Sequence, residues 1–301
     1  MTRSVLVTGG GGFVGSHLVA GLVALGHAVT AVDRCFDDPT RERLCGATLI
    51  EKDLIANSGT GLPAADLVIH GAAITTPPGD IAPDHTAFIR TNLQLLRTTL
   101  DHAVSSGAAD FVFLSSSGVF RPEDGAGIHL ESTQPTADLP YARAKRAGEH
   151  EVAVAGGTLR AISVRLGPVY GPAEVARDTR TLVSPLRRWL DRVASNQPIL
   201  LTHPAERRDW TFAPDLPHAL LALLRGDHTG GVYHLTSGQV VSNLELARLV
   251  ADLVPDTSIE IAPSPVAPRL PMGSDRLDLA ALYGWTPLRE GITLILEEAR
   301  A

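Results

Sequence analysis

Four consecutive glycines near the start of the chain constrain its fold more than any other feature. They follow a short apolar run at residues 4–8 and precede a helical pattern that ends at Gly26. Gly9, Gly12 and Gly15 hold a G-x-x-G-x-x-G spacing, which suits a tight turn, a close approach of backbone amides to a pyrophosphate, and close packing of a helix on a strand. A strand, a glycine turn and a helix in this order predict a dinucleotide site, whereas a glycine cluster without that context is often only a loop.

Further apolar runs continue this alternation along the first half of the chain. We expect strands at residues 27–32, 47–51, 67–70, 111–114 and 160–166, with helices notably at 86–106 and 141–155. Apolar strands that alternate with helices pair in parallel, because each right-handed crossover helix covers one face of the sheet. The pattern predicts an α/β fold of the Rossmann type, with a doubly wound parallel sheet.

The pattern changes beyond about Pro168. Short helices, expected at residues 182–194, 216–224 and 244–253, alternate there with isolated strands and proline-rich links. We therefore divide the chain into an NAD-binding Rossmann domain at residues 1–167 and a smaller C-terminal substrate-binding lobe at residues 168–301. Residues 231–236 are apolar enough to return to the main sheet as a late strand.

Composition and charge disfavour several classes of partner. A formal net charge of −7 without a basic cluster argues against nucleic acid. The apolar stretches at residues 19–23 and 219–224 are far shorter than the roughly 20 residues of a membrane span. The first strand begins almost at Met1, which leaves no room for a signal peptide, so we expect a cytoplasmic protein. Neither Cys35 and Cys45 nor the histidines show a redox or ligand spacing, so we expect free thiols and no metal.

An acidic residue supports the dinucleotide hypothesis. Asp33 lies 18 residues beyond Gly15, at the end of the second expected strand. A carboxylate there can bind two ribose hydroxyls and would repel a 2′-phosphate, which favours NAD over NADP, although the adjacent Arg34 works against that preference. The ends of the third and fourth expected strands should form the adenine and ribose edges of the site, at Asp53, Leu54, Gly71, Ala72 and Ala73.

Tyr141 and Lys145 are four residues apart on an expected helix, so their side chains share one face. The pKa of a phenol is ordinarily near 10, so a tyrosine base needs a positive neighbour and low local polarity. Ser115, Ser116 and Ser117 come just past an apolar strand, where a parallel sheet presents functional groups. In isolation, such a tyrosine and lysine are more often surface residues, and serines often merely end a strand.

Several motifs occur together in one order: VLVTGGGGFVGSHL, VIHGAAITTPP, FVFLSSSGVF, PYARAKRAGE, VRLGPVYGP, RRDWTFAPDL and VYHLTSG. Through them nearly the whole chain resembles the extended short-chain dehydrogenase/reductase family, in its NAD-dependent epimerase/dehydratase branch. The resemblance implies that Tyr141 takes a proton from a sugar hydroxyl while the carbon gives hydride to NAD. It also implies that Lys145 holds the ribose and lowers the tyrosine pKa, and that Ser116, three residues before Val119, supplies the catalytic hydroxyl.

The resemblance also implies a set of binding residues. Ser117 and Arg208 are the expected substrate contacts. The expected cofactor contacts are Gly9, Gly12, Phe13, Val14, Gly15, Asp33, Arg34, Asp53, Leu54, Gly71, Ala72, Ala73, Asn92, Tyr141, Lys145 and Pro168.

Particular residues disfavour some of the family's reactions in this chain. Relatives that dehydrate a nucleotide sugar commonly carry an acidic pair where this chain has Ser117 and Gly118, and neither of these can act as a general acid at neutral pH. Arg208 resembles an arginine that binds the substrate diphosphate, although it could instead pair with Asp209. The family's usual asparagine before the Tyr-Gly-Pro sequence is replaced by Pro168, which argues against a diphosphate contact.

Three hypotheses follow. The first is a nucleotide-sugar epimerase that keeps its NAD bound through the turnover. The second is an NAD-dependent dehydrogenase of a free sugar or sugar acid, which releases NADH. The third is a catalytically silent dinucleotide sensor, which the presence of both Tyr141 and Lys145 disfavours. The resemblance also implies a homodimer, in which the helices expected at residues 86–106 and 141–155 pair across a two-fold axis as they do in relatives.

Overall fold

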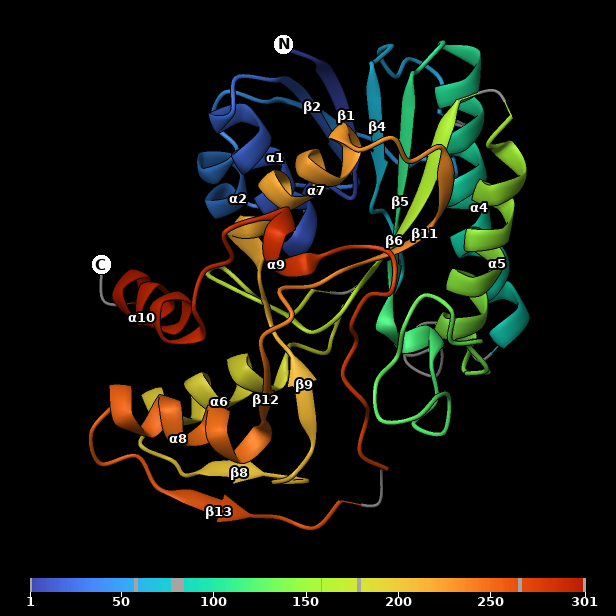
Figure 1. Ribbon diagram of the computed structural model, residues 1–301. Helices are drawn as coiled ribbons and strands as arrows, with labels where there is room; N and C mark the ends of the chain where they lie inside the picture. The colour runs from blue at the N-terminus through green and yellow to red at the C-terminus, as the bar shows by residue number, and fades with distance from the viewer. Residues whose placement is uncertain are drawn as a thin grey trace.

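A seven-stranded parallel sheet forms the centre of the computed structural model, which describes residues 2–56, 59–76, 84–157, 159–177, 180–264 and 267–299 (Figure 1). Pro77 and Pro78 of the VIHGAAITTPP motif lie outside these residues. The strand order is β11-β6-β5-β4-β1-β2-β3. The strands are β1 (Ser4–Thr8), β2 (Ala28–Asp33), β3 (Thr48–Glu51), β4 (Leu67–His70), β5 (Asp110–Ser116), β6 (Arg160–Leu166) and β11 (Gly230–Leu235).

The winding of the sheet reverses between β1 and β4. From β1 the chain moves outward to β2 and β3, and from β4 it moves the other way to β5 and β6. At this point Gly71 N donates to Thr8 O at 2.9 Å, just past the ends of the two strands. Open α/β sheets bind their ligands at such a reversal, outside the carboxyl ends of the strands. The predicted Rossmann fold is confirmed.

Helices cover both faces of the sheet (Figure 1). Side chains alternate along each strand, so Val5 and Val7 belong to one buried cluster and Leu6 to another. The first cluster lies under α1 (Phe13–Ala24) and α7 (Leu216–Arg225), and the second lies under α4 (His85–Ser105) and α5 (Pro140–Ala155).

Two segments from the second half of the chain complete the sheet layer. Strand β11 pairs in parallel with β6, from Gly230 opposite Ala161 to Leu235 opposite Leu166. Helix α7, which we expected in the lobe, instead packs on α1, where a Cβ on Gly21 would lie only 2.4 Å from Pro217. The physical reason is that α7 is apolar on most of its surface and buries seven of its residues, which needs a large apolar face.

The lobe lies below the sheet in Figure 1 and has its own core around Trp189 and Trp210. Its helices are α6 (Pro185–Ala194), α8 (Asn243–Leu253) and α10 (Leu288–Glu298). Its two-stranded sheets are β8 (Ile199–Leu201) with β13 (Ile259–Ile261), and β9 (Arg207–Asp209) with β12 (Val240–Ser242). A third pair is formed by β7 (Val169–Tyr170) and β10 (Thr211–Phe212), which run in parallel.

The shorter elements are α2 (Asp38–Arg43), α9 (Leu279–Leu282) and two 3-10 turns, η1 (Ser117–Val119) and η2 (Ala213–Asp215). Helix α6 begins three residues later than expected, because Ser184 accepts from Arg187 N at 3.1 Å and caps it, with Pro185 in the first turn. Among the described residues, no helix combines the length and apolar character that a membrane span requires.

Candidate active site

The glycine loop between β1 and α1 allows no larger side chains. Gly9 has a φ of +72°, and a Cβ there would lie 2.6 Å from Ala72 N. A Cβ on Gly15 would lie 2.0 Å from Gly9 O. The structure describes every residue of helix α1. Gly12 is its N-cap residue, no side chain caps its first amides, and its first turn contains no acidic residue. Its amino end is therefore suited to a phosphate group.

A cavity of ≈ 460 Å³ opens beside this loop. Most of the expected cofactor and substrate contacts line it, namely Gly9, Gly12, Phe13, Val14, Gly15, Asp33, Arg34, Asp53, Leu54, Gly71, Ala72, Ala73, Ser116, Tyr141, Lys145, Pro168 and Arg208. The structure thus brings together residues at or just past the ends of six strands of the sheet, β1 to β6, and residues of helix α5.

Asp33 stands at the end of β2, next to the glycine loop. Its Oδ2 accepts from Gly11 N at 2.9 Å and its Oδ1 accepts from Arg34 N at 2.7 Å. Burial raises the pKa of this carboxyl, while the two backbone hydrogen bonds and the nearby Arg177 and Arg34 oppose the rise. The carboxylate, the glycine loop and the uncapped helix end form a cradle that fits a dinucleotide with an unphosphorylated ribose.

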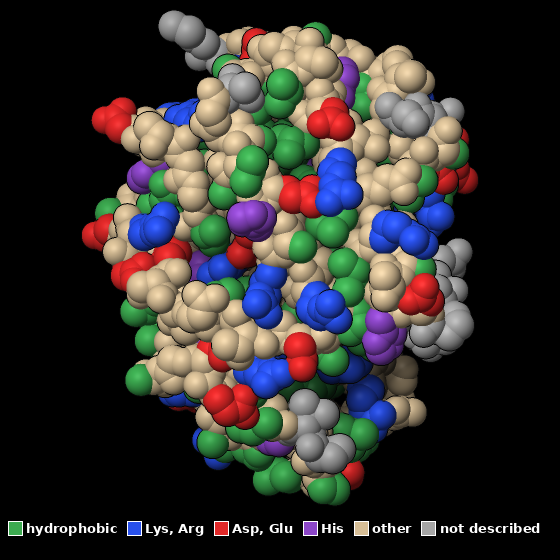
Figure 2. Space-filling model, turned by 90° about the vertical axis from the view of Figure 1, so that its right-hand side faces the viewer, with side chains coloured by type: hydrophobic (Ala, Val, Ile, Leu, Met, Phe, Trp, Pro, Cys, Tyr) green, Lys and Arg blue, Asp and Glu red, His purple; other side chains and the backbone are tan. Residues whose placement is uncertain are grey.

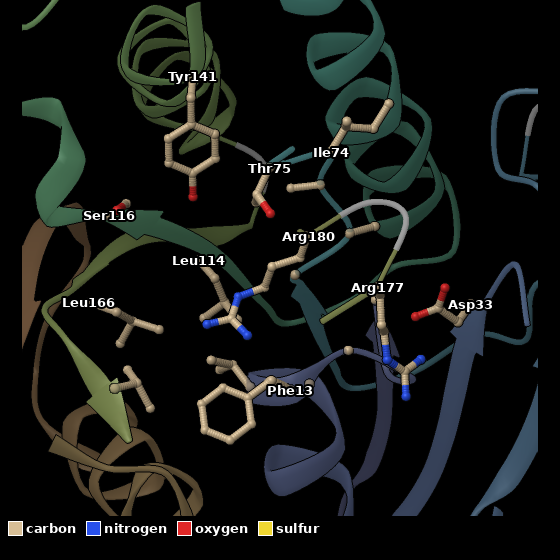
Figure 3. Close-up of a pocket in the computed structure, with 18 of the residues that line it drawn as sticks. Phe13, Asp33, Ile74, Thr75, Leu114, Ser116, Tyr141, Leu166, Arg177 and Arg180 are labelled. Atoms are coloured by element: carbon tan, nitrogen blue, oxygen red, sulfur yellow. The ribbon is translucent and has the colours of Figure 1, made fainter. Parts of the chain in front are cut away.

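Tyr141 reaches the cavity from the first turn of α5. Figure 3 shows its hydroxyl directed into the cavity, with Ser116, Thr75 and the Arg180 side chain around the same space. Burial raises the pKa of the phenol, and a hydrogen bond with Ser116 and the positive charge of Arg180 act in the opposite direction. Ser116 Oγ also accepts from Gly118 N at 3.0 Å, which fixes this hydroxyl at the end of β5.

Lys145 lies one helical turn after Tyr141 and is only 6% exposed. Its Nζ donates to Leu114 O at 2.7 Å and lies 4.6 Å from the centroid of the Phe113 ring. Burial lowers the pKa of this ammonium to about 8, against the opposing effect of Glu149. The Nζ is 5.7 Å from the centroid of the Tyr141 ring. Tyr141 and Lys145 therefore lie on the same face of α5, as we expected.

Sequence reasoning missed two arginines of this cavity, Arg177 and Arg180. Arg180 Nη2 pairs with the buried Glu174 at 2.5 Å, and its guanidinium carbon lies 5.4 Å from the centroid of the Phe13 ring. Arg177 Nη2 pairs with Asp37 at 2.8 Å. Neither residue belongs to a recognisable motif, and only the folding of their segment back over α1 and α2 brings them to the site.

Two expected contacts, Asn92 and Ser117, do not line this cavity, although Asn92 lines a small pocket that Tyr141 and Lys145 also border. Asn92 Oδ1 accepts from Ile74 N at 3.0 Å, and its Nδ2 donates to Ile74 O at 3.3 Å and to Phe88 O at 3.1 Å. Its amide is therefore occupied in holding the segment after β4, and the cavity wall is formed by Ile74 instead. Ser117 begins the 3-10 turn η1 and does not line the cavity, because the chain turns away from the site immediately after Ser116.

A second cavity of ≈ 400 Å³ lies in the lobe. Pro168, Pro185 and Arg208 line both cavities, so the two are adjacent. Arg188 and Arg192 of α6 also line the second cavity. Arg208 Nη1 pairs with Glu206 Oε1 at 3.0 Å and not with Asp209, whose carboxylate accepts from Thr236 Oγ1 and Met272 N. Within the described part of the chain, Arg208 Nε is buried and has no hydrogen-bond partner.

The fold and this site define an enzyme class that binds a dinucleotide at the end of a parallel sheet. Residues 5–236 match the model of the NAD dependent epimerase/dehydratase family. The chain belongs to this family and is an NAD-dependent enzyme of the extended short-chain dehydrogenase/reductase type.

Individual relatives agree with this assignment. The chain is 27% identical to dTDP-glucose 4,6-dehydratase of Streptomyces niveus, over 82% of this chain and 76% of that protein. It is also 27% identical to GDP-6-deoxy-D-mannose reductase of Pseudomonas aeruginosa, over 99% of this chain and 97% of the relative. The crystal structure of Thermus thermophilus UDP-glucose 4-epimerase in complex with NAD is 27% identical, covers 99% of each chain and superimposes with a TM-score of 0.80.

Proposed function

We propose that this enzyme oxidises and re-reduces a carbinol carbon of a nucleotide sugar, with NAD held in the larger cavity, and that the net result is epimerisation. The observation that carries the proposal is the adjacency of the two cavities. Tyr141 lies in one, three arginines line the other, and Arg208 borders both. A sugar at Tyr141 could therefore extend its diphosphate into the lobe, and the lobe formed from residues after Pro168 is the proposed substrate-binding part.

In this proposal the side chains of the first cavity divide the work. Tyr141 removes the proton of the sugar hydroxyl, and Ser116 holds the same oxygen beside the phenol. Lys145 holds the ribose of the cofactor and adds a positive charge to the buried site. Bound NAD supplies a hydride acceptor, and afterwards a donor, at the carbon that bears this hydroxyl.

Cofactor recognition is assigned to the cradle around the glycine loop. The amino end of α1 holds the pyrophosphate, and the Asp33 carboxylate takes the two ribose hydroxyls. The Asp33 acceptors now bonded to Gly11 N and Arg34 N face this cavity, so a ribose can share or replace those bonds. Asp53 and Leu54, with Gly71 to Ala73, provide the edges of the nucleotide site.

The lobe is assigned to the diphosphate. A planar guanidinium suits two phosphate oxygens, and Arg208 retains an unpartnered Nε among the described residues despite its bond to Glu206. Dehydration is not favoured, because no acidic side chain follows Ser116, where Ser117 and Gly118 stand.

The same proposal includes a homodimer formed through α4 and α5. Figure 2 shows this side of the molecule, where hydrophobic side chains lie among acidic and basic ones. Arg97 of α4 pairs with Glu151 of α5, and Val104 and Val154 on these helices are 42% and 73% exposed. Such a mixed surface is typical of an interface between soluble subunits. A cytoplasmic location fits the exposed free thiols of Cys35 and Cys45.

The test combines absorbance at 340 nm with product analysis, for purified protein mixed with NAD and a panel of nucleotide sugars, free sugars and sugar acids. We expect a nucleotide sugar to change configuration without accumulation of NADH. Net NADH formation with a free sugar or sugar acid would instead establish the dehydrogenase. If neither signal appears with any member of the panel while NAD binds, the proposed reaction fails for these compounds, and the dinucleotide-sensor hypothesis gains support.

A further inference from the structure

A buried ion pair lies behind the proposed active-site lysine. Arg165 of β6 donates from Nε to Glu149 Oε1 at 2.8 Å and from Nη2 to Glu149 Oε2 at 2.7 Å. The two side chains are 4% and 8% exposed. A buried pair of this kind is costly to desolvate and is often no more stable than apolar side chains of similar volume. Its presence here therefore calls for a role other than stability.

The pair is attached to the groups that line the cavity. Glu149 follows Lys145 by one turn of α5, as Lys145 follows Tyr141, so the three share one helix face. Glu149 Oε1 also accepts from Ser115 Oγ at 2.6 Å, and Lys145 Nζ donates to the neighbouring Leu114 O. The carboxylate and the ammonium are thus tied to consecutive residues at the end of β5.

Several elements near Lys145 contribute titratable or charged groups. Helix α5 contributes Tyr141 and Glu149, β6 contributes Arg165, β4 contributes His70, and β11 contributes His234, whose Nε2 lies 3.4 Å from Arg165 Nη1. Burial, and for His70 the field of Lys145, lowers the pKa of His70 to about 3, and burial foremost lowers that of His234 to about 4. Both histidines are therefore neutral at pH 7. The central charges of this group are those of Lys145, Glu149 and Arg165, while Glu131 lies 4.0 Å from His234 Nδ1 and Arg180 acts on Tyr141.

We propose that Glu149 and Arg165 are positioning residues that keep Lys145 charged and in place beside Tyr141. The proposal rests on the function assigned above to these two active-site residues. Neither Glu149 nor Arg165 lines the cavity, so both act through Lys145. Arg165 holds the carboxylate at a fixed distance and partly offsets its charge, so that Glu149 supports the ammonium without drawing it away from the cavity.

Loss of Glu149 and loss of Arg165 should shift the pKa of Lys145 in opposite directions. Burial brings the pKa of Lys145 down to about 8, and Glu149 opposes this. Without the carboxylate the ammonium should lose its proton at lower pH, by about 1 unit, since a close opposite charge changes a pKa by roughly 1–3 units. Without Arg165, the uncompensated carboxylate should move the deprotonation of Lys145 to higher pH.

The chain offers a direct measurement, because Lys52 and Lys145 are its only lysines. Protein labelled with ¹³C at lysine Cε should give two resonances, which Lys52→Arg assigns, and their pH titration reports the protonation of Lys145 with Lys52 as internal reference. We expect the Lys145 midpoint to fall in Glu149→Gln, to rise in Arg165→Met and to lie between these in the double variant. Arg165→Lys, which keeps the charge and adds a third labelled resonance, should leave the Lys145 midpoint at its wild-type value.

A Lys145 midpoint that is the same in all these variants would overturn the proposal, as would shifts of the same sign in Glu149→Gln and Arg165→Met. Circular dichroism identifies any single variant that does not fold, and the double variant, which removes both charges of the Glu149–Arg165 pair together, then provides the comparison with wild type. The outcome is separable from the proposed function, because the titration needs no substrate and Tyr141→Phe tests catalysis independently.

Discussion

The sheet half and the lobe provide their functional groups in different ways. At the sheet, the glycine loop, Asp33 and Ser116 each stand at the carboxyl end of a strand, so short runs of sequence determine where they lie. In the lobe, Arg188 of α6, Arg208 of β9 and Asn243 of α8 meet in one cavity although they are far apart in sequence. The proposed catalytic and cofactor groups are thus placed by local sequence, whereas the proposed substrate contacts depend on how distant segments pack.

The largest effect should come from the catalytic group of the sheet half. Tyr141→Phe removes the proposed base and keeps the ring, so we expect turnover to fall by about 10²–10⁴-fold with little change in NAD affinity. Steady-state kinetics and calorimetric NAD titration measure the two quantities. Full turnover in this variant would remove the catalytic assignment.

A change in the glycine loop should come next. Gly15→Ala places a Cβ 2.0 Å from Gly9 O. Because this oxygen belongs to the backbone and cannot rotate away, we expect a loss of about 1–3 kcal/mol of stability together with weaker NAD binding. Gly284→Ala is the control, because a Cβ there meets nothing within 4 Å. Thermal unfolding with and without NAD distinguishes the variants, and equal behaviour would show that the loop does not need this close packing.

A substitution in the lobe should change the affinity for the substrate and not the rate of the chemical step. Arg208→Met removes the proposed diphosphate contact, and we expect KM for the nucleotide sugar to rise about 10–100-fold, as for the loss of a hydrogen bond to a charged group. Arg207→Met is a matched control, since Arg207 is the neighbouring, 54% exposed residue. An equal KM in both variants would assign the diphosphate to other residues.

A smaller effect should appear in cofactor choice. Asp33→Asn removes the charge that repels a 2′-phosphate, so the preference for NAD over NADP should fall by roughly tenfold, equivalent to about 1.4 kcal/mol. Asp38→Asn, on the exposed start of α2, should leave the preference unchanged. An unaltered preference in Asp33→Asn would show that backbone geometry selects the cofactor.

The same comparison explains what the sequence could predict. Strands β1, β4 and β6 lie where the apolar runs indicated, and most of the expected contacts line one cavity, because each is held within a few residues of a strand end. The packing of helix α7 differs from the prediction. Its apolar surface indicates that it is buried, but the sequence does not indicate which element it packs against. The lobe strands, only two or three residues long, carry no recognisable period.

Residues that act through distant partners were the hardest to assign. Arg180 reaches the first cavity from a segment without a motif, and its positive charge opposes the rise that burial causes in the Tyr141 pKa, an effect that we had expected from Lys145. Asn92 was assigned to the cofactor, yet its amide is used by the backbone of Ile74 and Phe88. In both cases the spacing of residues along the chain does not indicate which groups the side chain contacts in the folded protein.

The most direct test of the central claim follows the hydride itself. The nucleotide sugar that the panel identifies is prepared with deuterium on the carbon to be oxidised, and is incubated with enzyme and unlabelled NAD. The account predicts a product that retains its deuterium and a solution free of deuterated NADH, because the hydride returns from the same bound cofactor. Deuterated NADH in solution together with an oxidised sugar would contradict the account and identify a dehydrogenase.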